Sequence, residues 1–175
     1  MFNDDPVRPH LTEEFRLSNN RLGLALIDNH NCKAAVCIAI SNEVPTNEIE
    51  LDEFSSDKTN FEKSIAIFYT IWSYDKGCGR KMLFNAVDWL QKNRPEIKRF
   101  VTLSPKNNMA RNFHLKNGAK ELSVNSDSLN ISLQSASFQS KEVGNLKNAS
   151  LKLNKVHDNL YVDGLDIIHN KYLIV

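Results

Sequence analysis

The stretch SIAIFYTIWSYDKGCGR, residues 64–80, decides the fold of this chain. In its first part, Ile65, Ile67, Tyr69 and Ile71 alternate with residues that are also mostly apolar. Because successive side chains of a strand point to opposite faces, both faces of this segment are apolar. A strand of this kind is buried on both sides, so we expect residues 64–72 to form the central strand of a sheet.

A glycine turn, residues 77–80, follows this strand, and the apolar spacing beyond it predicts a helix that stops at Pro95. The N–H groups in the first turn of a helix point outward, and glycines let a phosphate approach the backbone closely. Basic side chains add positive charge at the same place. The pattern predicts a diphosphate site, with a tight structural turn as the alternative. Its residues are Lys76, Gly77, Cys78, Gly79, Arg80 and Lys81.

Strand and helix signals continue on both sides of this unit. The expected strands are residues 22–27, 33–40, 99–103, 119–124 and 129–133, and the expected helices are a short one opening near Thr12 and one over residues 108–116 that ends at Asn117-Gly118. The order is two strands, the central strand, a helix, a strand, a helix and two strands. This order predicts an α/β or α+β fold with a mixed sheet.

Residues 41–62 are expected to form a polar loop, with a short edge strand as an alternative. This segment is the most acidic part of the chain, chiefly through Glu43, Glu48, Glu50, Asp52 and Glu53. They form either a solvated surface or a region that attracts an amine substrate. They are also the candidates for a general base.

Composition excludes several classes of function. The chain has 175 residues, a net charge of +1, 41% hydrophobic and 25% charged residues, which is ordinary for a globular domain. No basic excess indicates nucleic acid, no apolar run reaches the ~18 residues of a membrane span, and no secretory signal begins the chain. Three cysteines without a CxxC pair predict no metal site. We expect a cytoplasmic protein that binds neither nucleic acid nor membrane.

Two motifs resemble those of the GCN5-related N-acetyltransferase (GNAT) family. Residues 74–79 occupy the register of its Arg/Gln-x-x-Gly-x-Gly/Ala turn, with Tyr74 in the first place. A second family motif matches Asn107, Ala110, Phe113, His114, Lys116 and Gly118, with His114 where the family carries Tyr. The resemblance covers roughly residues 20–133. It implies a mixed, mostly antiparallel sheet flanked by helices, in an acyl-CoA-binding domain of residues 1–134.

The resemblance also implies a reaction: transfer of an acetyl group from acetyl-CoA to an amine of a small molecule or peptide. Backbone groups of Ile71, Trp72 and Ser73 would hold the pantetheine and the thioester carbonyl. His114 stands at the place of the general acid, and a pKa near 6.5 suits it to proton transfer; the alternative is a polar residue on the flank of a helix. Tyr74 and Tyr69 are further candidate acids. The opposite side of the pantetheine would be lined by Asn107, Ala110 and Phe113.

A further resemblance concerns residues 68–71 (FYTI) and 98–105 (KRFVTLSP), which are similar to the catalytic domain of malonyl-CoA decarboxylase. It implies an acetyltransferase-like fold and a catalytic role for Ser104; the alternative for Ser104 is a turn or helix-cap residue. The downstream histidine motif of the decarboxylase has no counterpart in this chain. Cys78 is either a small residue between glycines or a thiol activated by the helix N-terminus.

Residues 135–175 form a separate, β-rich extension by their alternating apolar residues. It would extend the sheet, contact a second copy in a homodimer, or bind another partner. Three functions stay open for the whole chain. They are an acyl-CoA-dependent N-acyltransferase, a decarboxylase acting on malonyl-CoA or a related thioester, and a non-catalytic module that binds CoA or a partner.

Overall fold

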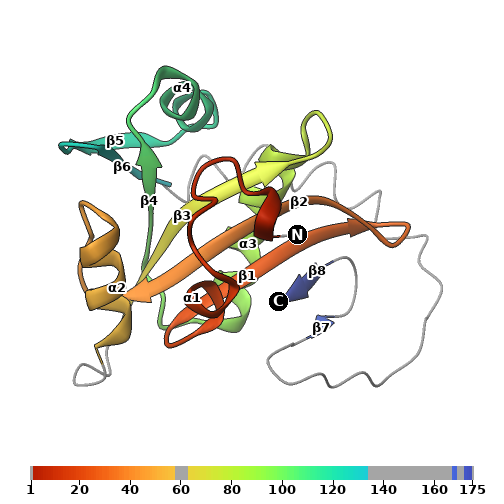
Figure 1. Cartoon of the computed structure of the whole chain (residues 1–175), viewed down its shortest axis with the longest axis horizontal. Helices are drawn as coiled ribbons and strands as arrows, with labels where there is room; N and C mark the ends of the chain where they lie inside the picture. The colour runs from red at the N-terminus through yellow and green to blue at the C-terminus, as the bar shows by residue number, and fades with distance from the viewer. Residues whose placement is uncertain (1, 58–62, 134–166, 169–171, 175) are drawn as a thin grey trace.

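A computed structural model describes residues 2–57, 63–133, 167–168 and 172–174 of the chain (Figure 1). A 3-10 turn, Phe2–Asp4, opens it. The helices are α1 (Glu13–Leu17), α2 (Glu48–Ser56), α3 (Cys78–Asn93) and α4 (Asn108–Lys116). The strands are β1 (Arg21–Asp28), β2 (Asn31–Ser41), β3 (Ile65–Ser73), β4 (Arg99–Pro105), β5 (Lys120–Val124), β6 (Ser128–Ser132), β7 (Ile167–Ile168) and β8 (Tyr172–Ile174).

The strands of the described residues form one sheet in the order β5-β6-β4-β3-β2-β1-β8-β7. Neighbouring strands are antiparallel except β3 and β4, which run parallel and are joined through α3. This confirms the predicted mixed, mostly antiparallel sheet flanked by helices. Of the β-rich extension expected over residues 135–175, the structure describes the strands β7 and β8, and the rest of that extension lies outside the described residues.

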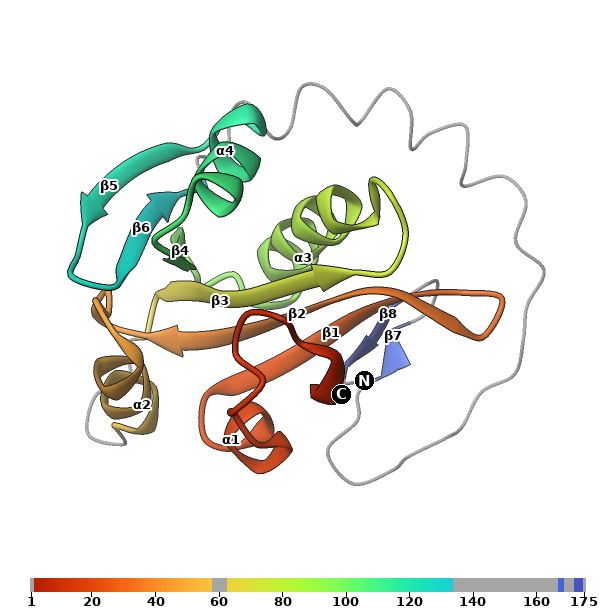
Figure 2. The same cartoon turned by 45° about the horizontal axis from the view of Figure 1, so that its top comes forward.

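Two apolar cores lie on opposite faces of the sheet. Figure 2 shows α3 on one of these faces and the N-terminal segment with α1 on the other. The first packs α3, through Met82, Leu83 and Leu90, against one face. The second lies under the N-terminal segment and α1, and it includes Phe2. Because helices cover both faces, β3 is buried on both sides, as its residues predict.

The structure corrects the expected loop at residues 41–62, because part of this segment is helix α2. Asn47 caps the helix by accepting a hydrogen bond from the Glu50 N–H at 3.0 Å, and Glu50 accepts one from the Thr46 N–H at 2.7 Å. The Asn47 side chain thus caps the helix, and the Glu50 carboxylate reaches back to the residue before the cap. The helix buries Leu51 completely, which holds it against the core under the N-terminal segment.

The turns and caps around the central unit follow from local sequence. Asn29 and His30 both have positive φ, which closes the β1–β2 hairpin. Asn107 caps α4 by accepting from the Ala110 N–H at 2.8 Å, and Gly118 ends that helix with a φ of 85°. These elements place the amino ends of α3 and α4 beside the ends of β3 and β4.

Candidate functional site

The parallel strands β3 and β4 separate partway along their length. Their register runs from Ile65 opposite Arg99 to Phe68 opposite Thr102 and stops there, although both strands continue. At the same level β3 carries a bulge, since Cys37 and Ile38 of β2 face Thr70 and Phe68, which leaves Tyr69 as the extra residue. Beyond this point the β3 backbone has no rung to β4. The splay opens toward Ser73 and the glycine turn.

The glycine turn has the conformation that an anion site needs. Gly77 precedes α3 with a φ of 83°, a left-handed value that favours glycine, and no side chain caps the helix. A Cβ built on Gly77 would meet nothing within 4 Å, so the turn faces open space. At Gly79 a Cβ would lie 3.3 Å from the Ser73 Oγ, so glycine allows the helix to approach the end of β3. An uncapped helix N-terminus beside open space attracts an anion.

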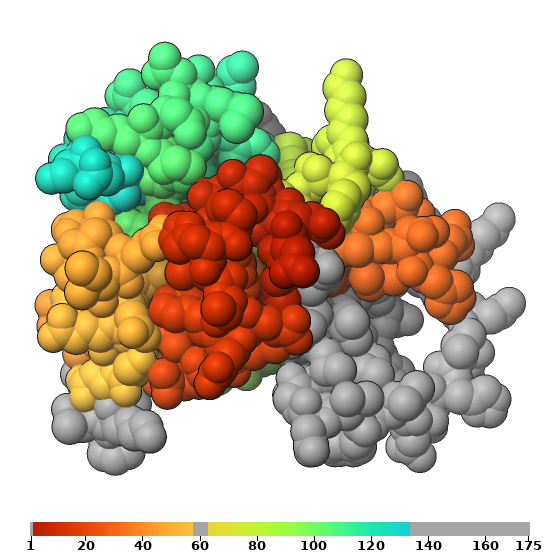
Figure 3. Space-filling view, viewed as in Figure 1, coloured from red at the N-terminus to blue at the C-terminus, as the bar shows by residue number. Residues whose placement is uncertain are grey.

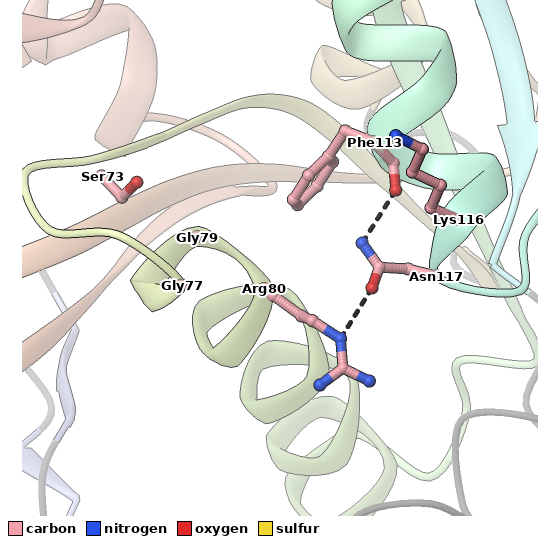
Figure 4. A pocket seen from close by; sticks show the side chains of 7 residues that line it. All are labelled: Ser73, Gly77, Gly79, Arg80, Phe113, Lys116 and Asn117. Carbon is pink, nitrogen blue, oxygen red and sulfur yellow. Dashed lines mark hydrogen bonds between the residues drawn. The ribbon is translucent and has the colours of Figure 1, made fainter.

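A cavity of about 450 Å³ lies between this turn and α4 (Figure 4). Arg80 spans the two helices, since its Nε donates to the Asn117 Oδ1 at 2.7 Å, and Asn117 Nδ2 donates to the Phe113 carbonyl at 2.8 Å. The cavity therefore joins a helix N-terminus, cationic groups and an aromatic ring. The residues that line it are Ser73, Gly77, Gly79, Arg80, Phe113, Lys116 and Asn117.

The cavity brings together five of the predicted cofactor-binding residues, namely Ser73, Gly77, Gly79, Arg80 and Phe113. The other predicted contacts do not line it. Lys76 and Lys81 are exposed and flank the turn, and Trp72 packs against Phe2 on the opposite face of the sheet. The other predicted cofactor-binding residues that do not line the cavity are Ile71, Cys78, Asn107 and Ala110.

The three predicted catalytic residues lie apart from one another and do not line the cavity. Ser104 is buried on β4, where its hydroxyl donates to the Thr102 Oγ1 at 2.9 Å. The Tyr74 hydroxyl donates to the Asp4 carboxylate at 2.7 Å and accepts from the Trp72 Nε1 at 3.2 Å. Desolvation and the neighbouring Asp4 raise the pKa of Tyr74.

His114 is buried in α4 with 4% of its surface exposed. Burial lowers the pKa of His114 to about 4, so the imidazole is neutral at pH 7. Its Nδ1 atom is buried without a hydrogen-bond partner in the described residues. Tyr69, a further candidate acid, is also buried, and desolvation raises its pKa. Neither group is a ready proton donor in this state.

Three of the five acidic residues named between residues 43 and 53 have structural partners. Glu48 pairs with Arg8 and with His10, both at 2.7 Å, and Asp52 pairs with Arg21 at 2.7 Å. Glu50 belongs to the cap of α2. Among the described residues no three His, Cys, Asp or Glu side chains gather as a metal site. None of the described helices has the length and apolar character to cross a membrane.

The N-terminal segment, residues 2–12, crosses the sheet on the face opposite α3, and its sequence does not predict this position (Figures 2 and 3). Asp5 anchors the segment: its carboxylate pairs with Arg16 at 2.9 Å, both side chains being fully buried, and accepts from the Thr70 hydroxyl at 2.8 Å. Arg8 donates to the carbonyls of Tyr69 and Leu103. No local pattern in the sequence predicts the contacts of Asp5 with Thr70 and of Arg8 with Tyr69 and Leu103, because they join residues 61 to 95 positions apart.

Fold and site together define an α+β protein in which two parallel strands separate beside a glycine turn at an uncapped helix N-terminus. No family model and no curated protein matches the chain. It shares its fold with part of the malonyl-CoA decarboxylase of Agrobacterium vitis, at 24% identity and a TM-score of 0.51. The match covers 62% of this chain and 30% of the decarboxylase, so the chain spans less than a third of that protein.

Two other solved malonyl-CoA decarboxylases are similar to the chain. The protein from Cupriavidus metallidurans matches at 25% identity and a TM-score of 0.41, over 52% of this chain and 24% of its own. The protein from Rhodopseudomonas palustris matches at 19% identity and a TM-score of 0.40, over 57% and 25%. Of the two resemblances seen in the sequence, structural similarity supports the one to malonyl-CoA decarboxylase. Membership of the GNAT family stays a prediction.

Proposed function

We propose that this chain binds a CoA thioester at the splay of β3 and β4 and removes carbon dioxide from its acyl group. The observation that carries the proposal is the cavity, which runs from the open end of the splay to the uncapped N-terminus of α3. The diphosphate of CoA would lie at Gly77 and Gly79. Arg80 and Lys116 supply positive charge there.

The pantetheine arm would follow β3 beyond Phe68, where the backbone has no rung to β4. An extended amide-containing chain satisfies such free strand groups as an added strand does. From Tyr69 to Ser73 the strand rises about 13 Å, at roughly 3.3 Å per residue. This path leads the thioester from the glycine turn to the bulge at Tyr69.

Decarboxylation needs little from the protein. The bond between the carboxylate carbon and the α-carbon of the acyl group breaks, carbon dioxide leaves, and the electron pair moves onto the thioester as an enolate. The α-carbon then takes a proton from water. Backbone N–H groups of β3 at the splay would stabilise the charge on the enolate oxygen, as in an oxyanion hole.

Ser104 is the side chain that we assign to this reaction. Residues alternate along β4, and Phe100 belongs to the core under α3, so Ser104 is on the same face as the cavity. Its hydroxyl already donates to Thr102 and can turn to a carboxylate or an enolate oxygen. This assignment agrees with the sequence resemblance of residues 102–105 to the decarboxylase.

Acyl transfer to an amine is the second candidate, and the N-terminal segment weighs against it. With CoA in the cavity under α3 and α4, an amine would reach the thioester from the opposite face. Residues 2–8 fill the middle of that face (Figure 3), and Asp5 and Arg16 hold them by a fully buried ion pair. A reaction with no second organic substrate is compatible with this closed face.

Incubation with malonyl-CoA separates the candidate functions. We expect acetyl-CoA and carbon dioxide in equal amounts, measured by chromatography and by a coupled assay for carbon dioxide. Free thiol released from acetyl-CoA only when an amine is present would instead support the transferase. CoA binding by calorimetry without turnover of either thioester would support a binding module, and absence of CoA binding would refute the site itself.

A further inference from the structure

Arg8 joins the two splayed strands at the point where their pairing ends. Its Nη1 donates to the carbonyl of Tyr69 and its Nη2 to the carbonyl of Leu103 at 3.0 Å. These carbonyls belong to the residues that follow the last rung, Phe68 opposite Thr102. The guanidinium therefore replaces the next backbone pairing between β3 and β4, at the inner end of the splay.

The guanidinium of Arg8 keeps donors for a further ligand. Of the five N–H groups of an arginine side chain, one on Nε donates to Glu48 at 2.7 Å and one on each terminal nitrogen donates to a strand carbonyl. The other N–H group on each terminal nitrogen finds no acceptor among the described residues. An arginine guanidinium with N–H groups to spare can donate to the oxygens of a carboxylate.

The carboxylates near Arg8 are each shared with another cationic or basic group. Glu48 is shared between Arg8 and the exposed His10, and it lies on the Nε side of the guanidinium. Asp5, the other nearby carboxylate, is paired with Arg16 and accepts from the Thr70 hydroxyl. Burial makes an arginine charge act strongly on its surroundings, since little water screens it. A carboxylate at the splay would meet a fixed, desolvated cation.

We infer that Arg8 binds the free carboxylate of the acyl group and thereby selects carboxyacyl-CoA thioesters over plain acyl-CoA thioesters. The inference rests on the proposed function, because it assumes that the acyl end of a CoA thioester reaches the bulge at Tyr69. It adds a specificity residue outside the glycine turn and outside the strand that carries Ser104. Arg8 would then bind the substrate in addition to joining β3 and β4.

Binding to malonyl-CoA and propionyl-CoA tests this inference, because the two acyl groups have equal carbon counts and differ in the carboxylate. The Ser104→Ala chain, which we expect to be slow in turnover, is titrated with both thioesters and with CoA. We expect malonyl-CoA to bind about ten- to a hundredfold more tightly than propionyl-CoA, the range for hydrogen bonds to a charged group. Equal affinity for the two thioesters would overturn the inference.

Variants of the bridge supply the second part of the test. In the same background, Arg8→Gln should remove the preference for malonyl-CoA while the affinity for propionyl-CoA stays the same. Glu48→Gln keeps the guanidinium of Arg8 and removes the carboxylate that pairs with it. This variant should keep or increase the preference for malonyl-CoA. It provides the test if Arg8→Gln does not fold. A preference that survives Arg8→Gln, or that Glu48→Gln abolishes, contradicts the role of Arg8.

The outcomes also separate this inference from the proposed function. If none of the three ligands binds, the CoA site is wrong and the inference fails with it. If all three bind with one affinity, the CoA site stands and the inference about Arg8 fails. If malonyl-CoA is preferred through Arg8 but is never converted by the unsubstituted chain, the inference stands and the proposed reaction fails.

Discussion

Replacement of His114 by leucine is expected to change how the stability of the protein depends on pH. His114 is buried and its Nδ1 atom lacks a partner among the described residues, so the folded protein favours the neutral imidazole. The pKa is about 4 in the folded chain, against an ordinary value of 6.5. As the pH falls, His114 therefore takes up a proton in the unfolded chain at a higher pH than in the folded chain. Acid consequently lowers the free energy of unfolding.

The size of the effect follows from proton linkage. Above pH 6.5 both states carry the neutral ring, and the contribution of His114 to the pH dependence is near zero. As the pH falls from 6.5 toward 4, the unfolded state gains the proton and the free energy of unfolding decreases. Linkage gives a loss of about 2 kcal/mol between pH 7 and pH 5, and roughly 3 kcal/mol below pH 4.

Urea unfolding at pH 7 and pH 5, followed by circular dichroism, measures this loss. Other groups also titrate in this range, so the quantity of interest is the difference between the parent chain and His114→Leu. Leucine does not titrate, and we expect the variant to lose about 2 kcal/mol less than the parent over this interval. His30→Asn is the control, since His30 is exposed in the β1–β2 turn. Equal losses in the parent and His114→Leu would refute the reasoning.

Four further changes test the site and its support. Gly77→Glu should abolish measurable CoA binding through charge repulsion at the turn, whereas Gly77→Ala should cost only about 1 kcal/mol of stability for its left-handed φ. Arg80→Gln should weaken CoA binding about tenfold in calorimetry and reduce the salt dependence of that binding. Ser104→Ala should lower malonyl-CoA turnover by about a hundredfold or more, with CoA affinity retained. Asp5→Asn should lower the free energy of unfolding by about 3 kcal/mol, because it leaves Arg16 buried without its counter-ion; an unchanged urea midpoint would contradict that estimate.

The central strand, glycine turn and helix were predictable because their signals are local. The apolar faces of β3, the left-handed glycine at Gly77 and the stop at Pro95 each determine the backbone within a few residues of their own position. The cap at Asn107 and the left-handed Gly118 belong to the same kind of signal. Five of the residues expected to bind the cofactor accordingly line one cavity.

Helix α2 was not predicted because its residues are mostly polar and do not show the apolar spacing of an amphipathic helix. It exposes Ile49, an apolar residue, and buries Leu51 and Ser55, so the apolar spacing of a surface helix is absent. Its start signal, an Asn47 cap followed three residues later by Glu50, was present in the sequence. Weighting caps above composition would have found the helix.

The bulge and the arginine bridge were not readable from the sequence. Alternation along β3 continues through Tyr69 without a break, so nothing marks the extra residue. Arg8 reaches Tyr69 and Leu103 across 61 and 95 positions of the chain. Such contacts depend on the packing of the whole sheet. An arginine near the N-terminus is ordinarily solvated, and its burial is visible only in the fold.

In the proposed function the glycine turn would bind the CoA diphosphate, and the opposite side of the splay would determine which reaction follows. An amine with a pKa like that of lysine is a cation at neutral pH, and it would approach the guanidinium of Arg8 at the inner end of the splay. At about 4 Å and an effective dielectric constant near 20, two like charges repel by roughly 4 kcal/mol, and a carboxylate is attracted by as much. Glu48 offsets part of this from the Nε side, while the charge of Asp5 is balanced by Arg16. The sign of the buried charge thus favours a carboxyacyl group over an amine at this position.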